Sequence, residues 1–214
     1  MAVTDRATLS RELIARTALE LIDNDGLDGL SMRKLGSALG VEAMSLYHYI
    51  DNKEDLLNAI VDNLYGEIEL PSDIPGDDWE RAFRLALHSF HDVLLRHPAS
   101  LELFTTRQAS SGNALTVMSW AFDRCRLAGL DPEQAANTFH FCVAFVLGHA
   151  ATELGMMSRI ETNEEITLPA GGGMSPGFQA FLDHIAASGN AKVFEFGLEM
   201  LFASLSSTFG LSRS

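Results

Sequence analysis

Apolar residues recur every three to four positions along most of this chain, which is the spacing of amphipathic α-helices. The predicted helices cover about residues 10–23, 31–39, 43–50, 52–67, 77–96, 101–107, 113–127, 131–155, 176–187 and 190–209. Beyond residue 78 no segment shows the alternation typical of a β-strand. The pattern therefore predicts an all-α fold of about nine to ten helices.

The composition changes sharply at residues 70–78, LPSDIPGDD, which are rich in Pro and Asp and predict a linker. We therefore expect two domains. A three-helix domain over residues 1–67 contains a helix-turn-helix at about 31–50, and a larger helical domain covers residues 68–214. Residues 156–174 combine acidic residues with a Gly run, and they predict a long mobile loop.

Residues 31–50 have the pattern of a helix-turn-helix. The apolar positions that would hold its two helices together are Leu35, Leu39, Leu46 and Ile50. Gly36 is small enough for the second helix to approach closely, and Gly40 falls where a tight turn needs φ > 0. The second helix is too short to bury more than two or three side chains, so its outward side is available to a partner.

The acidic charge of the chain argues against DNA binding through bulk electrostatics. The net charge is −14, and residues 1–65 are also acidic, with six Lys or Arg against eleven Asp or Glu, a balance of −5. The run from Arg33 to Tyr49, however, contains two cations and only one acid, Glu42. Phosphate contacts would then depend on local cations, helix N-terminal amides and hydroxyls, and we predict weak non-specific binding.

The stretch from Leu9 to Tyr65 contains the sequences MRKLGSALGV and SLYHYIDNKEDLL. In the second of these, Leu46-Tyr47 is followed by a His and aromatic pair, then by Asn52-Lys53 and a double Leu. On these residues the chain resembles the DNA-binding domain of the tetracycline-repressor (TetR) family of transcriptional regulators. The resemblance implies a homodimer that binds a palindromic double-stranded DNA operator and leaves it when a small-molecule effector occupies a pocket in the C-terminal domain.

The resemblance also implies which side chains contact DNA. These positions are Ser31, Arg33, Ala43, Met44, Ser45, Tyr47, His48, Tyr49 and Lys53. Arg33 takes the place of the family's base-reading Arg, so a guanine contact is expected, and Tyr47 takes the place of its phosphate-binding phenol. Ala43 stands where the family's prototype has a long amide, and because Ala contacts only a thymine methyl, we do not expect the prototype's operator. The alternative for Tyr47 and Tyr49 is half-buried packing.

The C-terminal helix, residues 190–209, is apolar on most of its sides, so other helices must bury it on those sides. The helix over residues 131–155 is similarly apolar and contains small Ala residues. We predict that both helices pair with their copies in a four-helix bundle of a homodimer. The alternative is that both belong to the core of one chain. Palindrome reading favours the dimer, because two recognition helices must lie about 34 Å apart.

An effector pocket needs a mainly apolar cavity with a few convergent polar groups. The candidates are His88, Phe90, His91, Arg107, Met118, Trp120, His140, Phe141, His149 and Phe178. Arg107 would pair with an anionic effector, and its alternative is a surface salt bridge. For His140 and His149 the alternative is a buried imidazole bonded to the backbone.

A metal site is not expected. His88 and His91 lie three positions apart on one predicted helix, a spacing compatible with metal binding, but two ligands are a weak signal. We therefore predict no metal and no cofactor. The metal-chelating residues of the tetracycline-binding prototype are also missing, because the position of its key His falls near Leu103. Tetracycline with magnesium is therefore not the expected effector.

Other function classes have little support. The HExxH, GxSxG and GxxxxGK[ST] motifs are absent from the sequence, so an enzyme is not expected. No apolar run reaches the roughly 20 residues that span a bilayer, and the N-terminus has no apolar signal core. We expect a cytoplasmic protein with Cys125 and Cys142 reduced and no membrane partner. The alternative to a regulator is an all-helical small-molecule binding or interaction protein without operator recognition.

Overall fold

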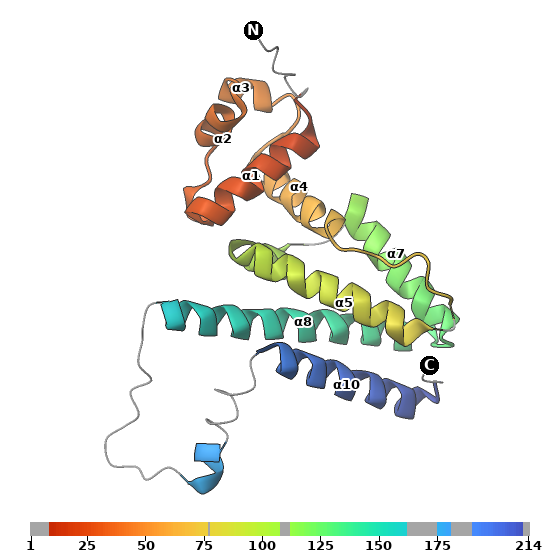
Figure 1. The fold of residues 1–214 in the computed structure, drawn as a ribbon. Coiled ribbons are helices and arrows are strands. Elements are labelled where there is room, and N and C mark those ends of the chain that lie inside the picture. Colours follow the sequence, from red (N-terminus) through yellow and green to blue (C-terminus); the bar gives the residue numbers. More distant parts are fainter. Residues whose placement is uncertain (1–8, 77, 108–111, 162–174, 181–189, 212–214) are drawn as a thin grey trace.

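The computed structural model of the protein describes residues 9–76, 78–107, 112–161, 175–180 and 190–211. Within these residues every regular element is helical, which confirms the all-α fold (Figure 1). The α-helices are α1 (Arg11–Asp25), α2 (Met32–Leu39), α3 (Ala43–Leu46), α4 (Lys53–Gly66), α5 (Trp79–Arg96), α6 (Leu101–Thr106), α7 (Gly112–Leu127), α8 (Pro132–Glu161) and α10 (Asn190–Phe209). Two short 3-10 turns, η1 (Leu27–Gly29) and η2 (Pro98–Ser100), follow α1 and α5.

The N-terminal helices α1 to α4 share one core. Ser10, Ser31 and Asn52 cap α1, α2 and α4, and each side-chain oxygen accepts the backbone N–H three residues further on, at 3.1, 3.3 and 2.9 Å. The buried apolar residues of this part include Ile14, Ala18, Ile22, Leu35, Leu46, Ile50, Leu56, Ile60 and Leu64. Burial of these side chains fixes the helix-turn-helix on the α1 and α4 pair.

The C-terminal helices form a layered bundle in which α5, α8 and α10 lie one below the other, and α7 packs beside α4 and α5 (Figure 1). The buried residues include Trp79, Phe83, Phe90, Leu94, Cys125, Cys142, Val146, Phe194, Leu198 and Phe202. They belong to the same continuous cluster as the buried residues of α1 and α4. The bundle core is therefore in direct contact with α4, so a movement of its side chains would reach that helix.

The segment after α4 is held in place by a buried cation. Arg124 of α7 donates to the backbone carbonyl oxygens of Ile74 at 2.9 Å, Pro75 at 3.2 Å and Pro71 at 3.2 Å. The side chain of Ile74 is also buried. The residues predicted as a linker are thus ordered by contacts with a helix about fifty residues away in the sequence.

The ends of α8 and of the segment after it differ from the prediction. We expected the helix to end at residue 155, but it continues to Glu161, so the first part of the predicted loop is helical. Residues 162–174 of that loop lie outside the described residues, as do residues 181–187 of the predicted helix 176–187, whose first turns are helical over 176–180. Among the described residues, one helix, α8 over Pro132–Ser158, is long and apolar enough to span a membrane by length and composition alone.

Candidate nucleic-acid interface and inner cavity

The turn between α2 and α3 brings two backbones into close contact. A Cβ atom on Gly36 would stand 2.9 Å from the carbonyl oxygen of Val41 and 3.1 Å from the backbone nitrogen of Ala43. Gly40 ends α2 with a φ of 68° and a ψ of 29°, the left-handed conformation that Gly adopts without steric cost. The structure therefore contains the helix-turn-helix expected over residues 31–50, with both glycines in their predicted roles.

The second helix of this motif is shorter than predicted. The α-helix ends at Leu46, and the N–H groups of Tyr47 and Tyr49 then donate to carbonyl oxygens three residues back, at 3.3 and 2.9 Å. Bonds of this kind close a narrower turn than an α-helix does. The prediction of a regular helix over residues 43–50 is wrong in its second half, although Leu46 and Ile50 are fully buried as expected.

The outward side of α3 and of the following turn is open to solvent. Met44 is 71% exposed, Tyr47 44% and Tyr49 41%, so both Tyr side chains are partly packed and partly open to solvent. Of the other predicted DNA contacts, Arg33, His48 and Lys53 are exposed, Ala43 and Ser45 are half-buried, and Ser31 is an exposed residue that caps α2. All of these positions lie on or next to α2 and α3, in the turn that follows α3, or at the start of α4, and α2 and α3 form the tip of the molecule in Figure 1.

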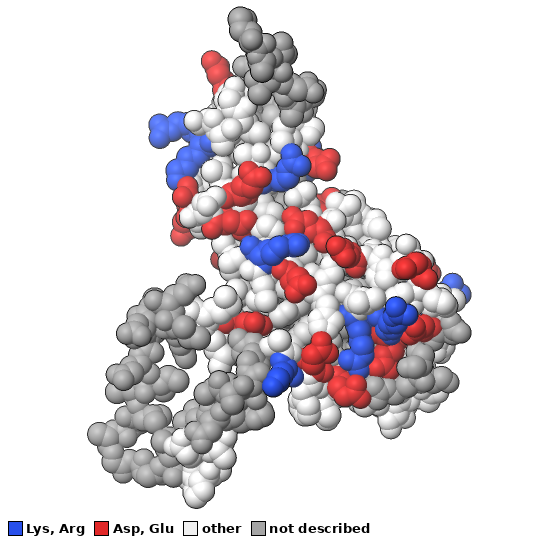
Figure 2. Space-filling view, in the orientation of Figure 1, with Lys and Arg blue, Asp and Glu red and all other residues white. Residues whose placement is uncertain are grey.

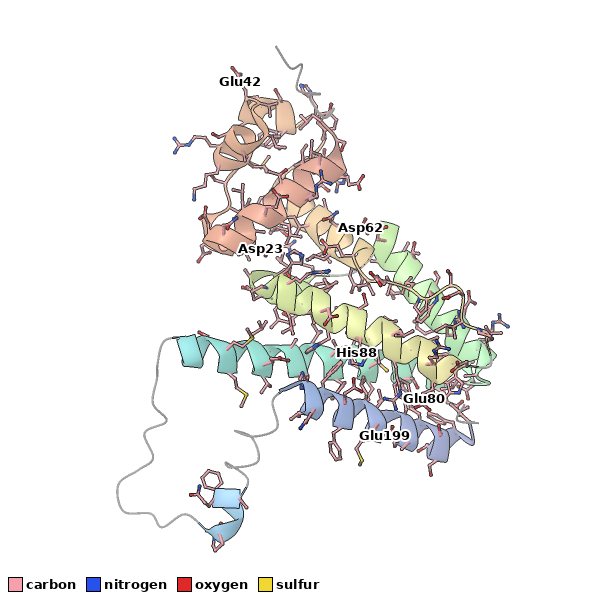
Figure 3. The ribbon with its side chains drawn as sticks, in the orientation of Figure 1. Asp23, Glu42, Asp62, Glu80, His88 and Glu199 are labelled. Carbon is pink, nitrogen blue, oxygen red and sulfur yellow. The ribbon has the colours of Figure 1, made fainter. Side chains whose placement is uncertain are left out.

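Few Lys or Arg side chains lie on this surface. Figure 2 shows blue side chains at the edge of the molecule where α2 lies, with red side chains next to them. Lys34 is 3.3 Å from Asp25 in an exposed ion pair. Within the part of the chain that the structure describes, Arg33 and Lys53 form no ion pair, so their charges remain available to phosphate. Glu42 stands at the outer end of the tip in Figure 3, where it adds an acid.

An ion pair that the sequence did not indicate supports this tip. Arg11 of α1 donates to both carboxylate oxygens of Asp55 at 2.6 and 2.7 Å, and to the carbonyl oxygen of Tyr49 at 3.1 Å. Asp55 also accepts the N–H of Asp51 at 3.0 Å. These bonds, with that from Arg11 the largest cause, hold the pKa of the Asp55 carboxyl below its usual range. The end of the helix-turn-helix is thereby joined to α1 and α4.

A small apolar cavity lies inside the bundle, between α4, α5, α7 and α8. Its volume is about 50 Å³, and its lining consists of Tyr65, Ile68, Leu70, Phe83, Ala86, Leu87, Phe90, Val117, Trp120, Ala121, Phe139, Cys142 and Val143. Phe90 and Trp120 are the predicted effector contacts in this lining. The indole Nε1 of Trp120 is buried and has no hydrogen-bond partner within the described residues. Burial raises the pKa of Cys142 to about 12, so this side chain is a neutral thiol.

The other predicted effector contacts do not line this cavity. Arg107 is 2.6 Å from Glu54, and His88 is 2.8 Å from Glu195, where Figure 3 shows it between α5 and α10. His91 and His149 face each other at 3.1 Å on the contact between α5 and α8. His140, Phe141 and Phe178 are exposed, and Met118 is half-buried on α7. For Arg107 the salt-bridge alternative is the one observed.

A second apolar hollow lies on the outside of the chain, between α8 and α10. Its volume is about 570 Å³, and its lining consists of Asn137, Thr138, Phe141, Phe145, Phe196, Gly197, Met200, Leu201, Ser204, Leu205, Thr208 and Phe209. Phe196 is 66% exposed, Phe141 60% and Met200 58%. Large apolar side chains exposed together are typical of a surface that contacts another protein.

Polar contacts hold α4 to the C-terminal bundle at its start, middle and end. In that order they are Glu54 with Arg107 at 2.6 Å, Asp62 with the N–H of Ala114 at 3.3 Å, and Glu67 with Arg96 at 2.9 Å. His97 reaches further, to Asp23 at the end of α1, at 2.7 Å. Figure 3 shows Asp23 and Asp62 on the side of α1 and α4 that faces the bundle. The helix that supports the tip is therefore also part of the bundle.

The structure thus joins a helix-turn-helix to a helical bundle that encloses a small apolar cavity. Residues 14–60 match the family model described as bacterial regulatory proteins, tetR family. Residues 70–208 match the model described as tetracyclin repressor-like, C-terminal domain. The chain therefore belongs to the tetR family of bacterial transcriptional regulators, as its resemblance to that family predicted.

Several known proteins are similar to this chain. An HTH-type transcriptional regulator from Saccharopolyspora erythraea is 31% identical over 145 residues, which cover 68% of this chain and 61% of the relative. The HTH-type transcriptional repressor DrrR1 from Streptomyces coeruleorubidus is 28% identical over 149 residues, which cover 70% of this chain and 55% of the relative. The matches thus span little more than half the length of these two relatives.

Among solved structures, ActR from Streptomyces coelicolor in complex with actinorhodin has a TM-score of 0.74 to this chain. The two chains are 27% identical, and the match covers 94% of this chain and 99% of ActR. The agreement therefore extends over both the helix-turn-helix and the bundle.

Proposed function

We propose that this protein is a homodimeric repressor that binds a palindromic DNA operator and is released from it by a small-molecule effector. The observation that carries the proposal is the solvent-exposed outward side of α3 and of the turn after it, where Met44 and Tyr47 project beside the fully buried Leu46. A short helix with one buried side and one open side fits the major groove of DNA. The two family matches, over residues 14–60 and 70–208, support a division into domains 1–67 and 68–214.

The apolar hollow between α8 and α10 supports the dimer. These are the helices that the sequence pattern assigned to a four-helix bundle across a two-fold axis, and Phe141, Phe196 and Met200 are the exposed side chains that such a bundle would cover. A soluble dimer also accounts for the long apolar surface of α8 without a membrane. We place the protein in the cytoplasm, where its operator would be.

The inner cavity is the proposed effector site. It has an apolar lining, and Trp120 offers a buried indole N–H that lacks a partner within the described residues. ActR is a similar protein whose structure contains a small molecule. Tyr65 and Ile68 belong to the lining and lie on or next to α4, so a molecule in the cavity would press on the helix that supports the DNA-binding tip. That contact would couple effector binding to operator release.

A mobility shift on the DNA upstream of the protein's own gene tests the proposal. The expected result is a specific complex at moderate salt that Arg33→Ala weakens by about 1–3 kcal/mol, because a guanine contact is lost. Tyr47→Phe should also weaken the complex, whereas Arg81→Ala, which removes an exposed cation of α5, should not. The salt slope should be smaller than that of a protein making about ten phosphate contacts.

The alternative function is a helical small-molecule binding protein that does not read an operator. It predicts that no upstream fragment is shifted, or that Arg33→Ala and Tyr47→Phe have no more effect than Arg81→Ala. The thermal midpoint of each variant is measured in parallel, because an unchanged midpoint rules out unfolding as the cause of weaker binding.

A further inference from the structure

Three side chains from two helices converge at one point between α5 and α8. His91 lies on α5, and His149 and Glu153 lie one turn apart on α8. The Nε2 atom of His91 is 3.1 Å from Nδ1 of His149 and 3.3 Å from Oε2 of Glu153. The remaining distance, from Nδ1 of His149 to Oε2 of Glu153, is 3.6 Å. Each of the three atoms therefore faces the other two.

One atom of this cluster lacks a hydrogen bond within the described residues. One N–H proton on an imidazole nitrogen points at a single acceptor, whereas Nε2 of His91 faces both Nδ1 of His149 and Oε2 of Glu153. Oε2 of Glu153 is buried and makes no well-formed hydrogen bond within the described residues. The side chains are only 7% exposed for His91, 11% for His149 and 15% for Glu153, so bulk water does not compensate. A buried carboxylate oxygen in such a place is stabilised by a cation.

The distances agree with those around a tetrahedral metal ion. Zn²⁺ binds His nitrogen at about 2.0–2.1 Å and carboxylate oxygen at about 2.0–2.2 Å. Two ligand atoms at these lengths, separated by the tetrahedral angle, stand about 3.3–3.5 Å apart. The three observed separations, 3.1, 3.3 and 3.6 Å, bracket that value. Two imidazoles and one carboxylate are also a ligand set that zinc sites use.

We propose that His91, His149 and Glu153 bind one divalent transition-metal ion of the Zn²⁺ type through Nε2, Nδ1 and Oε2. Both imidazoles bind a metal ion in their neutral form, each through one ring nitrogen. His149 and Glu153, together with Thr152, also line a hollow of about 430 Å³. A water or an oxygen atom of a small molecule would complete the tetrahedron.

Aromatic rings pack closely around the three proposed ligands. The ring of Phe194 on α10 stacks on that of His91, with centroids 4.2 Å apart and planes at 18°. It also lies 5.0 Å from the ring of His149 and stacks on Phe145 at 5.5 Å. His88, which the sequence paired with His91, instead contacts Glu195. The site is therefore built from α5, α8 and α10, and an ion in it would tie α5 to α8.

The inference goes beyond the proposed function, because none of these residues is a proposed DNA contact and none lines the inner cavity. Operator binding and metal binding are therefore measured on the same preparation as separate readouts. A protein that binds DNA but no metal would overturn the metal site alone, and a protein that binds metal but no DNA would overturn the operator proposal alone.

The test is a Zn²⁺ titration of the untagged, full-length protein after removal of metal with a chelator, followed by calorimetry. One ion per chain is the expected stoichiometry. Because loss of an outer-shell partner typically costs about 10–100-fold in metal affinity, loss of a ligand in His149→Ala or Glu153→Gln should cost at least that. The control is His140→Ala, which removes an exposed imidazole from the same helix and should leave the affinity unchanged.

Co²⁺ gives a second readout, since a tetrahedral Co²⁺ ion with His ligands absorbs more strongly in the visible than the aqueous ion. The wild-type protein and His140→Ala should show this absorption, and His149→Ala should not. Glu153→Gln keeps the shape of the side chain, and an unchanged circular dichroism spectrum shows that it is folded. The proposal is overturned if wild type and His149→Ala bind Zn²⁺ equally, or if His140→Ala loses as much affinity as Glu153→Gln.

Discussion

Arg11 and Asp55 are joined by two parallel hydrogen bonds, at 2.6 and 2.7 Å, although they are 44 residues apart in the sequence. The same guanidinium donates to the carbonyl oxygen of Tyr49 at 3.1 Å. A planar, forked donor can make such contacts simultaneously, which a Lys ammonium cannot do with the same geometry. Arg11 thus ties α1 and α4 to the last turn of the helix-turn-helix.

Replacement of Arg11 by Ala should weaken operator binding more than it lowers stability. The pair is partly exposed to solvent, so its loss should lower the free energy of unfolding by only about 0.5–1 kcal/mol. The turn that holds Tyr47 and Tyr49 loses an anchor, and the mobility shift should weaken several-fold. Arg16→Ala, which removes an exposed cation from the same helix, serves as the control. Equal effects of the two variants on DNA binding would contradict the anchoring role.

Stability should depend on acid through the same ion pair. The hydrogen bond from Arg11 is the main reason that the pKa of Asp55 lies below its ordinary value of 3.8. A lowered pKa stabilises the fold fully at pH above the ordinary value, and the contribution is lost as the pH falls through the folded-state value. Urea unfolding of wild type and Arg11→Ala should therefore give a constant difference above about pH 5 that shrinks below pH 3.8. A difference that stays constant in acid would show that the carboxylate is not involved.

The substitution Gly36→Ala should displace α3 from α2. The new Cβ would lie 2.9 Å from the carbonyl oxygen of Val41, and a backbone atom in a tight turn cannot move away cheaply. We expect a loss of about 1–3 kcal/mol in the free energy of unfolding, together with loss of the DNA complex. Gly155→Ala in α8 is the matched control, because among the described residues its added Cβ would meet no atom within 4 Å apart from its own stretch of helix, and Ala favours the helix. Denaturant curves that rank the two variants equally would contradict the close contact.

Arg124→Ala should be among the most destabilising substitutions on α7. It leaves the carbonyl oxygens of Ile74 and Pro75 without their charged donor. Removal of such a donor should cost about 2–3 kcal/mol in urea unfolding. Arg126→Ala on the same helix removes an exposed side chain, 3.8 Å from Asp123, and should cost less than about 0.5 kcal/mol. If both variants unfold at the same urea concentration, the ordering of the linker does not depend on Arg124.

Phe196→Glu should separate the proposed dimer. The side chain is 66% exposed in one chain, so its replacement disturbs no intramolecular core, but a carboxylate would be buried unpaired in the bundle between two copies. Sedimentation equilibrium should give the 23.3 kDa mass of one chain for this variant and twice that for the wild type. Leu115→Glu, a similarly exposed apolar position on α7, should remain dimeric. A wild-type protein that sediments as a single chain would refute the dimer.

The features that could be predicted from the sequence depend on neighbouring residues. The helix caps at Ser10 and Ser31, the turn at Gly40 and the buried pair Leu46 and Ile50 follow from local conformational preferences and helical spacing. The extent of α8 was underestimated because Gly155 and the acidic residues after it are typical of a helix end. The sequence also did not show how short α3 is, since a 3-10 turn and an α-helix bury apolar residues at nearly the same spacing.

The site could be predicted only in part, because several of its contacts join distant segments. Spacing along one helix suggested that His88 and His91 act together, whereas packing of α5 on α8 brings His91 to His149, 58 residues away. Arg107 likewise meets Glu54 across 53 residues. Helical periodicity shows which side of a helix is buried, but it does not show which helix covers it or in what register.

The interior between α4, α5, α7 and α8 has room for little more than a water molecule or two, at about 50 Å³, whereas sites for drug-sized molecules measure about 300–1,000 Å³. A small molecule of that size can enter only if the side chain of Phe90, Trp120 or Tyr65 moves aside. Closely packed cores resist gradual deformation and tend to switch between discrete arrangements. Enlargement of the cavity would thus displace α4 itself. Entry of the small molecule and dissociation of the protein from DNA would then occur together.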